Sequence, residues 1–385
     1  MTFFRAQRDD DSFDDVDLGR SARSPMTDRE RRTWLGWLLI GVALVIVIAL
    51  AFAPSPYVIE TPGPVYNTLG TVGEDDAPLI SIPDEETYET DGSLDLLTVS
   101  VLGSPSGPAN FFEVAMSWFD PSRSVQPLES VFPAGTTTDD QREQSAIQMT
   151  NSQQEAIAAA LTELGYEFST TVSIGALLDD SPAQGILEEG DVITSVDGVA
   201  VTGLTDLREK LAAHGADSPA QLGIERDGSP LEVEVTPTER DGAVVLGVGV
   251  EVSYDFPFDV SIELPNVGGP SAGMMFALGI YDKLTPDALT GGLTVAGTGT
   301  IDAAGTVGPI GGIRQKLYGA QQAGATLFLA PASNCDEVVG HVPGDLQVVA
   351  VETLEDAITA IETVSAGDDT SDLPTCEAAA AASAR

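Results

Sequence analysis

The spacing of apolar residues changes along the chain, and each change predicts a different kind of structure. A continuous apolar run from Trp34 to Ala53 predicts one long helix. The stretch from Gln144 to Leu164 has apolar residues at helical spacing and stops at Gly165. Between Gly165 and Thr238 short β-rich runs are separated by turn residues, and from Gly242 onward strand-like and helix-like segments alternate. The pattern therefore predicts an α+β protein with more than one folded part.

The run Trp34–Ala53 is 20 residues long, carries no charge and is ended by Pro54. At 1.5 Å per residue such a helix spans about 30 Å, the thickness of the hydrocarbon core of a bilayer. We predict a single-pass transmembrane helix and favour it over a cleaved signal peptide, whose apolar core is shorter. Three basic residues lie directly before this run: Arg29, Arg31 and Arg32. The next one is Arg123, so the positive-inside rule predicts a cytoplasmic N-terminus and an extracytoplasmic remainder.

The charge balance excludes one class of partner. Acidic residues outnumber basic ones 60 to 17, giving a formal net charge of -43. Nucleic-acid binding needs clustered Lys and Arg, so we expect no nucleic-acid partner. The two cysteines, Cys335 and Cys376, both lie on the predicted extracytoplasmic side, where disulfides persist. They form either a disulfide or two unpaired thiols.

The module between Gly165 and Thr238 carries two recognisable motifs. Ser181-Pro182-Ala183 follows its first strand, and Gly190-Asp191-Val192-Ile193 opens a second strand. With a helix at Thr205–Ala213 and two more strands, this order resembles a bacterial PDZ domain. The resemblance implies binding of a peptide C-terminus along a strand edge. No Gly-Leu-Gly-Phe type carboxylate loop precedes Val172, so a purely architectural role is the alternative.

A serine lies in the segment Gly268-Gly269-Pro270-Ser271-Ala272-Gly273, before an apolar stretch that predicts a helix over Ser271–Tyr281. Pro270 suits the first turn of a helix, so the Ser271 hydroxyl is expected among unpaired backbone amides at the positive end of the helix dipole. An oxyanion could be held there. The alternative is an ordinary capping serine, with Gly269 serving only a tight turn.

Lys316 is one of three lysines in the chain. On the helix predicted to begin at Ile313 it shares an inward stripe with Ile313, Leu317 and Ala320. Burial disfavours the charged amine and lowers its pKa, which would allow the neutral amine to act as a general base. The alternative is a lysine that extends along the surface with its stem packed below.

Ser271 and Lys316 at this spacing, with Gly297-Thr298-Gly299-Thr300-Ile301 between them, resemble the proteolytic domain of Lon proteases. The plan of membrane helix, PDZ module and Lon-type domain is similar to the bacterial membrane-anchored PDZ-Lon family of peptidase type S16. The resemblance implies that Ser271 is the nucleophile and Lys316 the general base, with Thr298, Gly269 and Pro270 in support. This sequence departs from the Lon pattern at Gly268, where Lon proteases commonly have an acidic residue.

The sequence contains few residues that could support another catalytic mechanism. A histidine-based triad would need His214 or His341, which we expect to be exposed polar residues. Lys283 is expected to interact with the C-terminal end of its helix. Two histidines and two cysteines form no metal-ligand cluster, and no Gly-x-x-x-x-Gly-Lys-Ser/Thr motif is present. We therefore expect no cofactor, no metal and no ATP.

The expected organisation has six parts: a disordered cytoplasmic tail (1–32), the transmembrane helix (33–53), an extracytoplasmic segment (54–164), the PDZ domain (165–238), the Lon-type domain (242–362) and a disordered tail (363–385). A strand at 94–101 is assigned to the Lon-type domain. The predicted function is an ATP-independent serine endopeptidase acting on extracytoplasmic protein or peptide substrates. The alternatives are a catalytically silent membrane-tethered PDZ scaffold and a peptidase that processes only itself. The resemblance also implies a homo-oligomer.

Overall fold

The structure is a computed structural model, and it describes residues 28–73, 75–133, 135–178, 181–240, 242–265 and 267–383. The chain divides into two compact units, Met1–Ala53 and Pro54–Arg385. Of the tail expected at 1–32, residues 1–27 lie outside the described residues, whereas 28–32 already belong to a helix.

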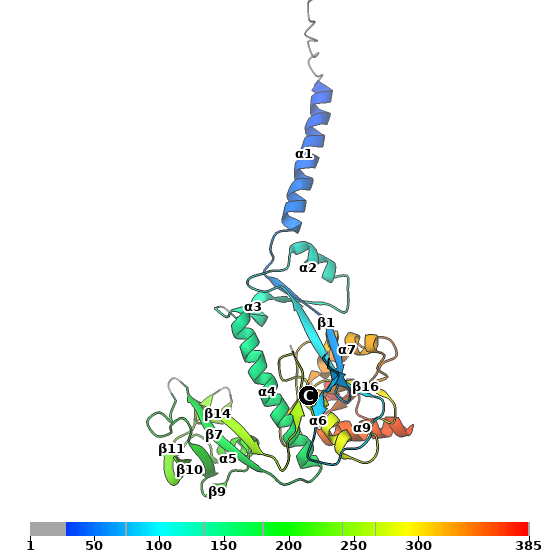
Figure 1. The fold of residues 1–385 in the computed structure, drawn as a ribbon. Helices are drawn as coiled ribbons and strands as arrows, with labels where there is room; N and C mark the ends of the chain where they lie inside the picture. Colours follow the sequence, from blue (N-terminus) through cyan, green and yellow to red (C-terminus); the bar gives the residue numbers. More distant parts are fainter. Residues whose placement is uncertain are drawn as a thin grey trace, which may run out of the picture. The chain divides into compact units, whose positions relative to one another are not determined.

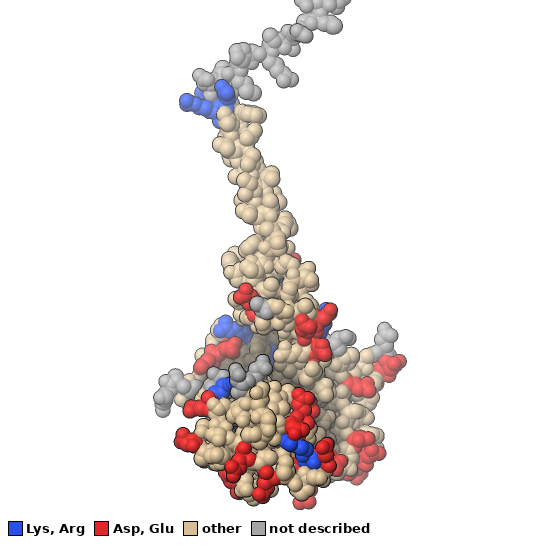
Figure 2. All heavy atoms as spheres, turned by 90° about the vertical axis from the view of Figure 1, so that its left-hand side faces the viewer, with Lys and Arg blue, Asp and Glu red and all other residues tan. Residues whose placement is uncertain are grey.

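The described residues of the first unit form helix α1 (Asp28–Ala51). Its segment Arg31–Ala51 is long and apolar enough to cross a membrane. Figure 2 shows Lys and Arg side chains gathered at one end of this helix and none along the rest. A signal sequence near the N-terminus can meet the same criteria of length and apolar composition, so the helix by itself fits either a membrane anchor or a signal sequence.

The second unit contains a six-stranded sheet, called the first sheet, with strand order β20-β19-β16-β5-β1-β6 (Figure 1). Four neighbouring strands, β20, β19, β16 and β5, run parallel, and β1 and β6 add to them in antiparallel fashion. The strands are β1 (Tyr57–Asn67), β5 (Ser93–Leu102), β6 (Ser124–Pro127), β16 (Thr294–Gly297), β19 (Leu327–Pro331) and β20 (Gln347–Val351). The strand expected at 94–101 is β5.

Both faces of the first sheet are buried, which explains its nearly continuous apolar strands. In β19, Leu327 and Leu329 pack into one core and Phe328 and Ala330 into the other, because side chains alternate along a strand. Helices α4 (Thr138–Glu163), α6 (Gly273–Leu284) and α9 (Leu354–Ala366) contribute to the first core, and α7 (Ile313–Ala323), α8 (Cys335–Val338) and α10 (Cys376–Ser383) to the second. This mixture of helices and strands is the predicted α+β class.

A second sheet has strand order β11-β10-β8-β7-β14, with β9 paired to β8. Its core includes Leu207 and Leu211 of helix α5. The elements are β7 (Ser169–Leu177), β8 (Val192–Val196), β9 (Val199–Ala200), α5 (Leu204–His214), β10 (Ala220–Arg226), β11 (Ser229–Val235) and β14 (Val248–Asp255). The sequence placed β14 with the segments after Gly242, but the structure pairs it with β7 from Ser169 to Leu177. That assignment was wrong because strands that are distant in the sequence can pair, and adjacency in the sequence does not show which strands do so.

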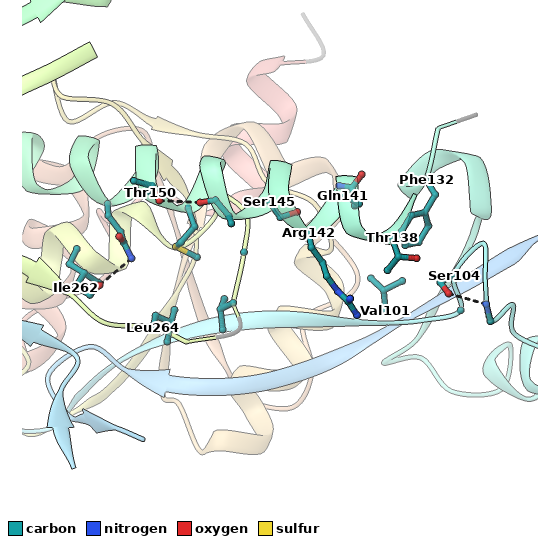
Figure 3. Close-up of a pocket in the computed structure, with 17 residues that line it drawn as sticks. Val101, Ser104, Phe132, Thr138, Gln141, Arg142, Ser145, Thr150, Ile262 and Leu264 are labelled. Atoms are coloured by element: carbon teal, nitrogen blue, oxygen red, sulfur yellow. Dashed lines mark hydrogen bonds between the residues drawn. The ribbon is translucent and has the colours of Figure 1, made fainter. Parts of the chain in front are cut away.

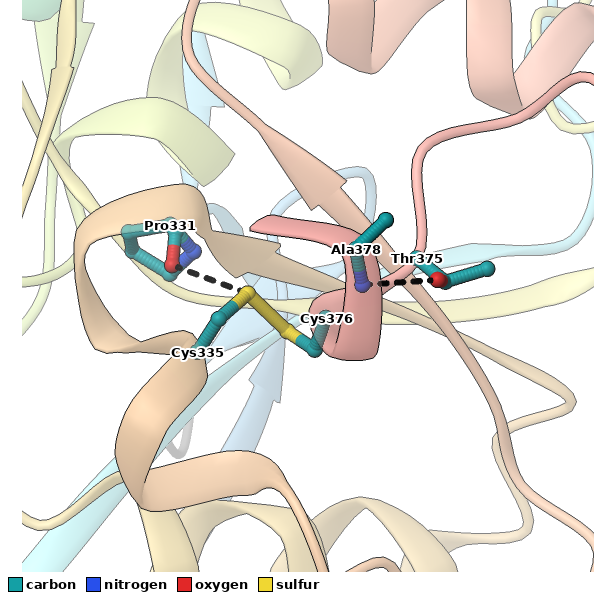
Figure 4. Close-up of a disulfide and its surroundings, with 5 residues drawn as sticks. All are labelled: Pro331, Cys335, Thr375, Cys376 and Ala378. Carbon is teal, nitrogen blue, oxygen red and sulfur yellow. Dashed lines mark hydrogen bonds between the residues drawn. A yellow bond between two sulfur atoms is a disulfide. The ribbon is translucent and has the colours of Figure 1, made fainter. Parts of the chain in front are cut away.

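The C-terminal segment is also more ordered than predicted. The tail expected to be disordered from residue 363 instead continues α9 to Ala366 and forms α10. Cys376, at the start of α10, is joined to Cys335 by a disulfide (Figure 4). The backbone amide of Ala350 in β20 also donates to the Pro374 carbonyl. These links attach a segment whose composition alone indicates no core.

Shorter elements connect the main ones. α4 begins six residues earlier than Gln144, because Thr137 and Asp140 form a capping box before its first turn. The remaining elements are β2 (Thr71–Val72), β3 (Ala77–Pro78), β4 (Ile80–Ser81), α2 (Phe111–Ser117), α3 (Leu128–Val131), β12 (Thr238–Arg240), β13 (Ala243–Val245), β15 (Ser261–Ile262), β17 (Thr300–Ile301), β18 (Val307–Gly308) and a 3-10 turn (Ala332–Asn334).

Candidate active site

The loop that carries Ser271 is held against helix α4. The backbone amide of Gly269 donates to the Ser145 carbonyl at 2.9 Å, and the Ser152 hydroxyl donates to the Pro270 carbonyl at 2.9 Å. Gly269 has φ +88°, a left-handed conformation that favours glycine. Nothing in the local sequence indicates the role of these two serines of α4, because that role depends on a contact across the fold.

Ser271 lies just before the helix rather than inside it. Helix α6 begins at Gly273, and its N-cap residue Ala272 supplies no side-chain cap. The expected helix start at Ser271 was therefore two residues early, and the Ser271 hydroxyl does not cap α6. Among the described residues, no acceptor is found for the backbone amides of Ser271 and Ala272. Two donors next to the hydroxyl are thus available to a ligand.

Lys316 is buried in the second core of the first sheet. Its neighbours on α7, Ile313, Leu317 and Ala320, are fully buried, and Lys316 itself is only 2% exposed. The helix starts at Ile313 as expected because Gly312, at φ +70°, takes the left-handed conformation at its N-cap. The side chain therefore does not extend along the surface.

The amine of Lys316 meets two hydroxyl groups. Its Nζ lies 2.8 Å from Ser271 Oγ and 2.8 Å from Thr298 Oγ1. Thr298 Oγ1 in turn donates to the Ser271 carbonyl oxygen at 2.9 Å, and the Gly299 amide donates to the same oxygen at 3.0 Å. Because the threonine hydroxyl uses its proton there, it can accept one from the amine. Thr298 thus connects the nitrogen to the backbone of Ser271.

Burial controls the charge of this amine. Removal from water disfavours the ammonium form and lowers the pKa of Lys316 to about 7. A substantial fraction of the amine is then neutral near neutral pH, with a lone pair available to the Ser271 proton. This is the protonation state that a general base requires.

A groove runs along α4, and the last residue in its lining, Gly268, precedes Ser271 by three positions. It has a cavity volume of about 1080 Å³ and lies between the first half of α4, the end of β5 and the segment before Gly268. Figure 3 shows Arg142 reaching from α4 towards Val101 of β5. Arg142 is the only charged residue among the described residues that line the groove.

One wall of the groove offers an unpaired strand edge. β16 pairs with β5 only from Ser93 to Leu96, ending at Gly297. From Leu97 to Leu102, the same edge of β5 has no strand partner among the described residues. An extended peptide could therefore add to β5 beyond the end of β16.

Gly268, where an acidic residue was expected from the Lon pattern, packs tightly against α4. A Cβ atom at this position would lie 2.7 Å from Ser145 Cβ and 3.2 Å from the Ser145 carbonyl carbon. The close approach of the loop to α4 explains the glycine, since any side chain would push the two apart.

The other titratable candidates lie elsewhere. His214 contacts Asp197 and Ser218 in the second sheet unit, and His341 contacts the Val339 carbonyl. Lys283 lies in the last turn of α6, where partial burial lowers its pKa. Within the described part of the chain, no group of three or more His, Cys, Asp or Glu residues could hold a metal ion.

The second sheet presents a separate candidate site. β14 is one of its two edge strands, and it is preceded by the turn Leu246-Gly247. Val248 and Val250 pack on the same core as Leu207 and Leu211 of α5. This module thus has an open strand edge preceded by a glycine-containing turn, at a place in the chain other than the segment before Val172.

The two sites are connected through the turn after β17. A cavity of about 930 Å³ lies between α5, β14 and this turn, and the Thr205 hydroxyl contacts Asp302 at 3.4 Å. Asp302 follows the Thr298–Ile301 segment, which contacts Ser271. α5 thus contacts the turn that directly follows the segment bonded to Ser271.

Comparison with known proteins identifies both modules. Residues 147–236 match the PDZ domain family, and residues 256–363 match the Lon protease (S16) C-terminal proteolytic domain. The matches leave β14 between them.

Curated relatives share the second of these regions. Lon protease 2 of Herpetosiphon aurantiacus is 39% identical over 118 residues, which cover 29% of this chain and 14% of that protein. Lon protease 2 of Bacillus subtilis is 33% identical over 107 residues, 27% of this chain and 19% of that protein. The chain thus spans less than a fifth of the length of either relative.

Among solved structures, the PDZ domain of the SdrC-like protein from Listeria monocytogenes is similar, with 20% identity and a TM-score of 0.20. The alignment covers 20% of this chain and 85% of that chain. By its two family matches and its Lon protease relatives, this chain combines a PDZ domain with a C-terminal proteolytic domain of the Lon (S16) family.

Proposed function

We propose that this chain is a membrane-anchored serine endopeptidase that uses a Ser271–Lys316 dyad and acts outside the cytoplasm without ATP. The observation that carries the proposal is the 2.8 Å contact between Ser271 Oγ and the Nζ of Lys316, a side chain that is only 2% exposed. The Lon-type domain match supports peptide-bond hydrolysis as the reaction. The chain contains no phosphate-binding loop motif that would couple this reaction to ATP.

The chemistry follows from the groups in place. Neutral Lys316 takes the Ser271 hydroxyl proton as Oγ attacks the peptide carbonyl carbon. The backbone amides of Ser271 and Ala272 then stabilise the oxyanion. Lys316 returns its proton to the leaving amine, and an ester joins the substrate acyl group to Ser271. Lys316 next takes a proton from water, whose attack releases the acid and restores the serine.

The substrate lies along the groove beside α4. The substrate backbone pairs with the open β5 edge between Leu97 and Leu102. This pairing places a substrate peptide bond just beyond the end of β16, next to Ser271. The lining is mostly uncharged, and Arg142 favours acidic over basic side chains near the far end. The PDZ domain delivers the chain end, held antiparallel on the outer edge of β14 with its carboxylate at the Leu246–Gly247 turn.

The dyad is tested by assaying cleavage of an unfolded protein by the full chain in detergent micelles. Ser271→Ala and Lys316→Ala are expected to abolish cleavage, whereas Lys283→Ala, which removes the half-buried lysine of α6, is the matched control and retains it. Cleavage by either the Ser271→Ala or the Lys316→Ala variant would show that these two residues are not the catalytic dyad. A fluorophosphonate probe gives a second readout, because a silent scaffold would leave Ser271 unlabelled.

The PDZ assignment has its own test. Substrates with a free C-terminal carboxylate are compared with the same substrates amidated at that end. We expect amidation to raise KM and leave kcat unchanged, since the carboxylate contributes to capture and not to chemistry. Equal KM values for the two forms would contradict capture of chain ends at β14.

A further inference from the structure

Helix α2 and the two residues that follow it expose large apolar side chains. We call this set the aromatic patch, and it comprises Phe111, Met116, Trp118 and Phe119. Trp118 is 74% and Phe119 83% exposed, and Phe111 and Met116 are 44% and 51% exposed. Burial of such side chains in a partner is strongly favoured, so several of them exposed on one short segment indicate an interaction surface.

The exposure does not come from a loosely attached helix. The opposite face of α2 buries Val114, which packs with Ile59 of β1 and Ala109. Asn110 and Glu113 form a complete capping box at the first turn. The structure thus fixes α2 firmly with its aromatic side chains directed outward.

The start of α2 is attached to the first residues of the second unit. The backbone amide and the hydroxyl of Ser55 both donate to the Ala109 carbonyl, each at 2.8 Å, and Pro54 forms a bridge with Asn110. Pro54 follows the last residue of α1, Ala51, by three positions, which span at most about 11 Å. If α1 crosses a bilayer, chain connectivity therefore keeps α2 close to the lipid surface.

The chemistry of the patch suits lipid. Trp and other aromatic side chains concentrate at membrane–water interfaces, where an apolar ring can lie among the lipid headgroups. Between Ala109 and Phe119 the only charged residue is Glu113, whose carboxylate accepts a hydrogen bond from the Asn110 amide. In a chain with net charge -43, this segment can approach a bilayer with little electrostatic repulsion.

We propose that the aromatic patch inserts into the bilayer surface next to the membrane helix and holds the catalytic unit to the lipid at a second point. The proposal rests on the proposed membrane anchoring. Insertion is driven by apolar burial and not by charge, so it depends little on salt or on anionic lipid.

Tryptophan fluorescence tests this directly, because the chain has three tryptophans and only Trp118 lies in the patch. Trp34→Phe combined with Trp37→Phe leaves Trp118 as the sole emitter. The full chain is reconstituted into phosphatidylcholine vesicles, with or without bromine atoms on the acyl chains. We expect blue-shifted Trp118 emission that brominated lipid quenches by at least half, at low and high salt. Water-like, unquenched emission would overturn the proposal.

Controls separate this proposal from the anchor. The Trp118→Phe chain retains Trp34 and Trp37, and their quenching reports insertion of α1. If they are quenched and Trp118 is not, the patch proposal fails while the anchor stands; if they are not quenched, the anchor itself fails. As a matched site, Leu231→Trp on exposed β11, with the three native tryptophans replaced by Phe, is expected to stay unquenched.

A second copy of the chain could also cover the patch. Covering by protein would shift Trp118 emission to the blue without bromine quenching, and the shift would grow with protein concentration. That outcome would overturn lipid docking. A tryptophan introduced by Phe111→Trp can report lipid contact when Trp118 and Phe119 are both replaced by Ser. We expect these two serine substitutions to abolish quenching of that tryptophan by brominated lipid. Both positions lie outside the dyad and the groove, so cleavage of a soluble substrate is expected to stay unchanged.

Discussion

Ser271, in the turn before α6, and Lys316, on α7, belong to segments on opposite faces of the first sheet, and they meet where β16 ends. α6 packs in the core on one face and α7 in the core on the other. β16 stops at Gly297, and the next residue, Thr298, hydrogen-bonds the Lys316 amine and the Ser271 carbonyl. The end of a short central strand thus opens the gap through which the two side chains reach each other.

The pKa of Lys316 predicts how cleavage depends on pH. The dyad needs the neutral amine, and the pKa of Lys316 is lowered to about 7. We expect kcat/KM on a substrate without titratable side chains to rise with pH through about 7 and to level off above about 8. A rate that stays constant across this interval while the protein remains folded would show that another group is the base.

The same group predicts how stability depends on pH. In the unfolded chain the pKa of Lys316 returns to about 10.5, so between about pH 7 and 10.5 only the unfolded state holds this proton. The free energy of unfolding therefore rises with pH in this window, by up to about 1.4 kcal/mol per pH unit. Below pH 7 the folded chain also holds the proton, so the full cost of burying the Lys316 ammonium lowers its stability.

Comparison with Lys316→Met isolates this effect. We expect the variant to be more stable than the natural chain below pH 7 and to lack the rise above it. The free energy of unfolding by urea in micelles, measured at several pH values, is the readout. Parallel pH curves for the two proteins would mean that Lys316 keeps its charge when folded.

The Thr298 hydroxyl is predicted to position the amine. Thr298→Val keeps the shape but removes the hydrogen bonds to Lys316 Nζ and to the Ser271 carbonyl. A misplaced base lowers kcat, here by about 10²-fold, with little change in KM. Thr298→Ser restores the hydroxyl and is expected to recover most of the rate. Failure of serine to rescue the rate would indicate that the methyl packing matters and the hydroxyl does not.

Much of this site could be predicted from local sequence, and the remainder depended on contacts between distant segments. Ser271 sits in a glycine-rich turn, and Lys316 falls on the apolar stripe of its own helix, so both were identifiable. The tether from Ser152 to Pro270 spans 118 residues, and nothing near Ser152 indicates it. β14 was grouped with the segments after Gly242 for the same reason, since its partner β7 lies more than seventy positions earlier.

Gly268 is predicted to be required by its contact with α4. Gly268→Ala places a Cβ atom against Ser145 and is expected to destabilise the fold by about 1 to 3 kcal/mol. Gly311→Ala is the matched control, because a Cβ atom there would meet no atom within 4 Å. Ser145→Gly should recover part of the loss, since one of the close contacts is the Ser145 Cβ. Equal unfolding free energies for the two alanine variants would contradict this packing.

The disulfide is predicted to hold the C-terminal helix in place without serving the chemistry. Cys335 and Cys376 are both buried and close a loop across 41 positions, for which loop entropy gives about 4 kcal/mol of stabilisation. In the variant with Cys335→Ala and Cys376→Ala, α10 loses its link to α8, and its amides should exchange with solvent faster than those of α9. Cleavage should persist, because neither cysteine contacts Ser271, Thr298 or Lys316. Hydrogen exchange by mass spectrometry and a parallel cleavage assay measure the two effects, and unchanged exchange in α10 would show that packing alone attaches it.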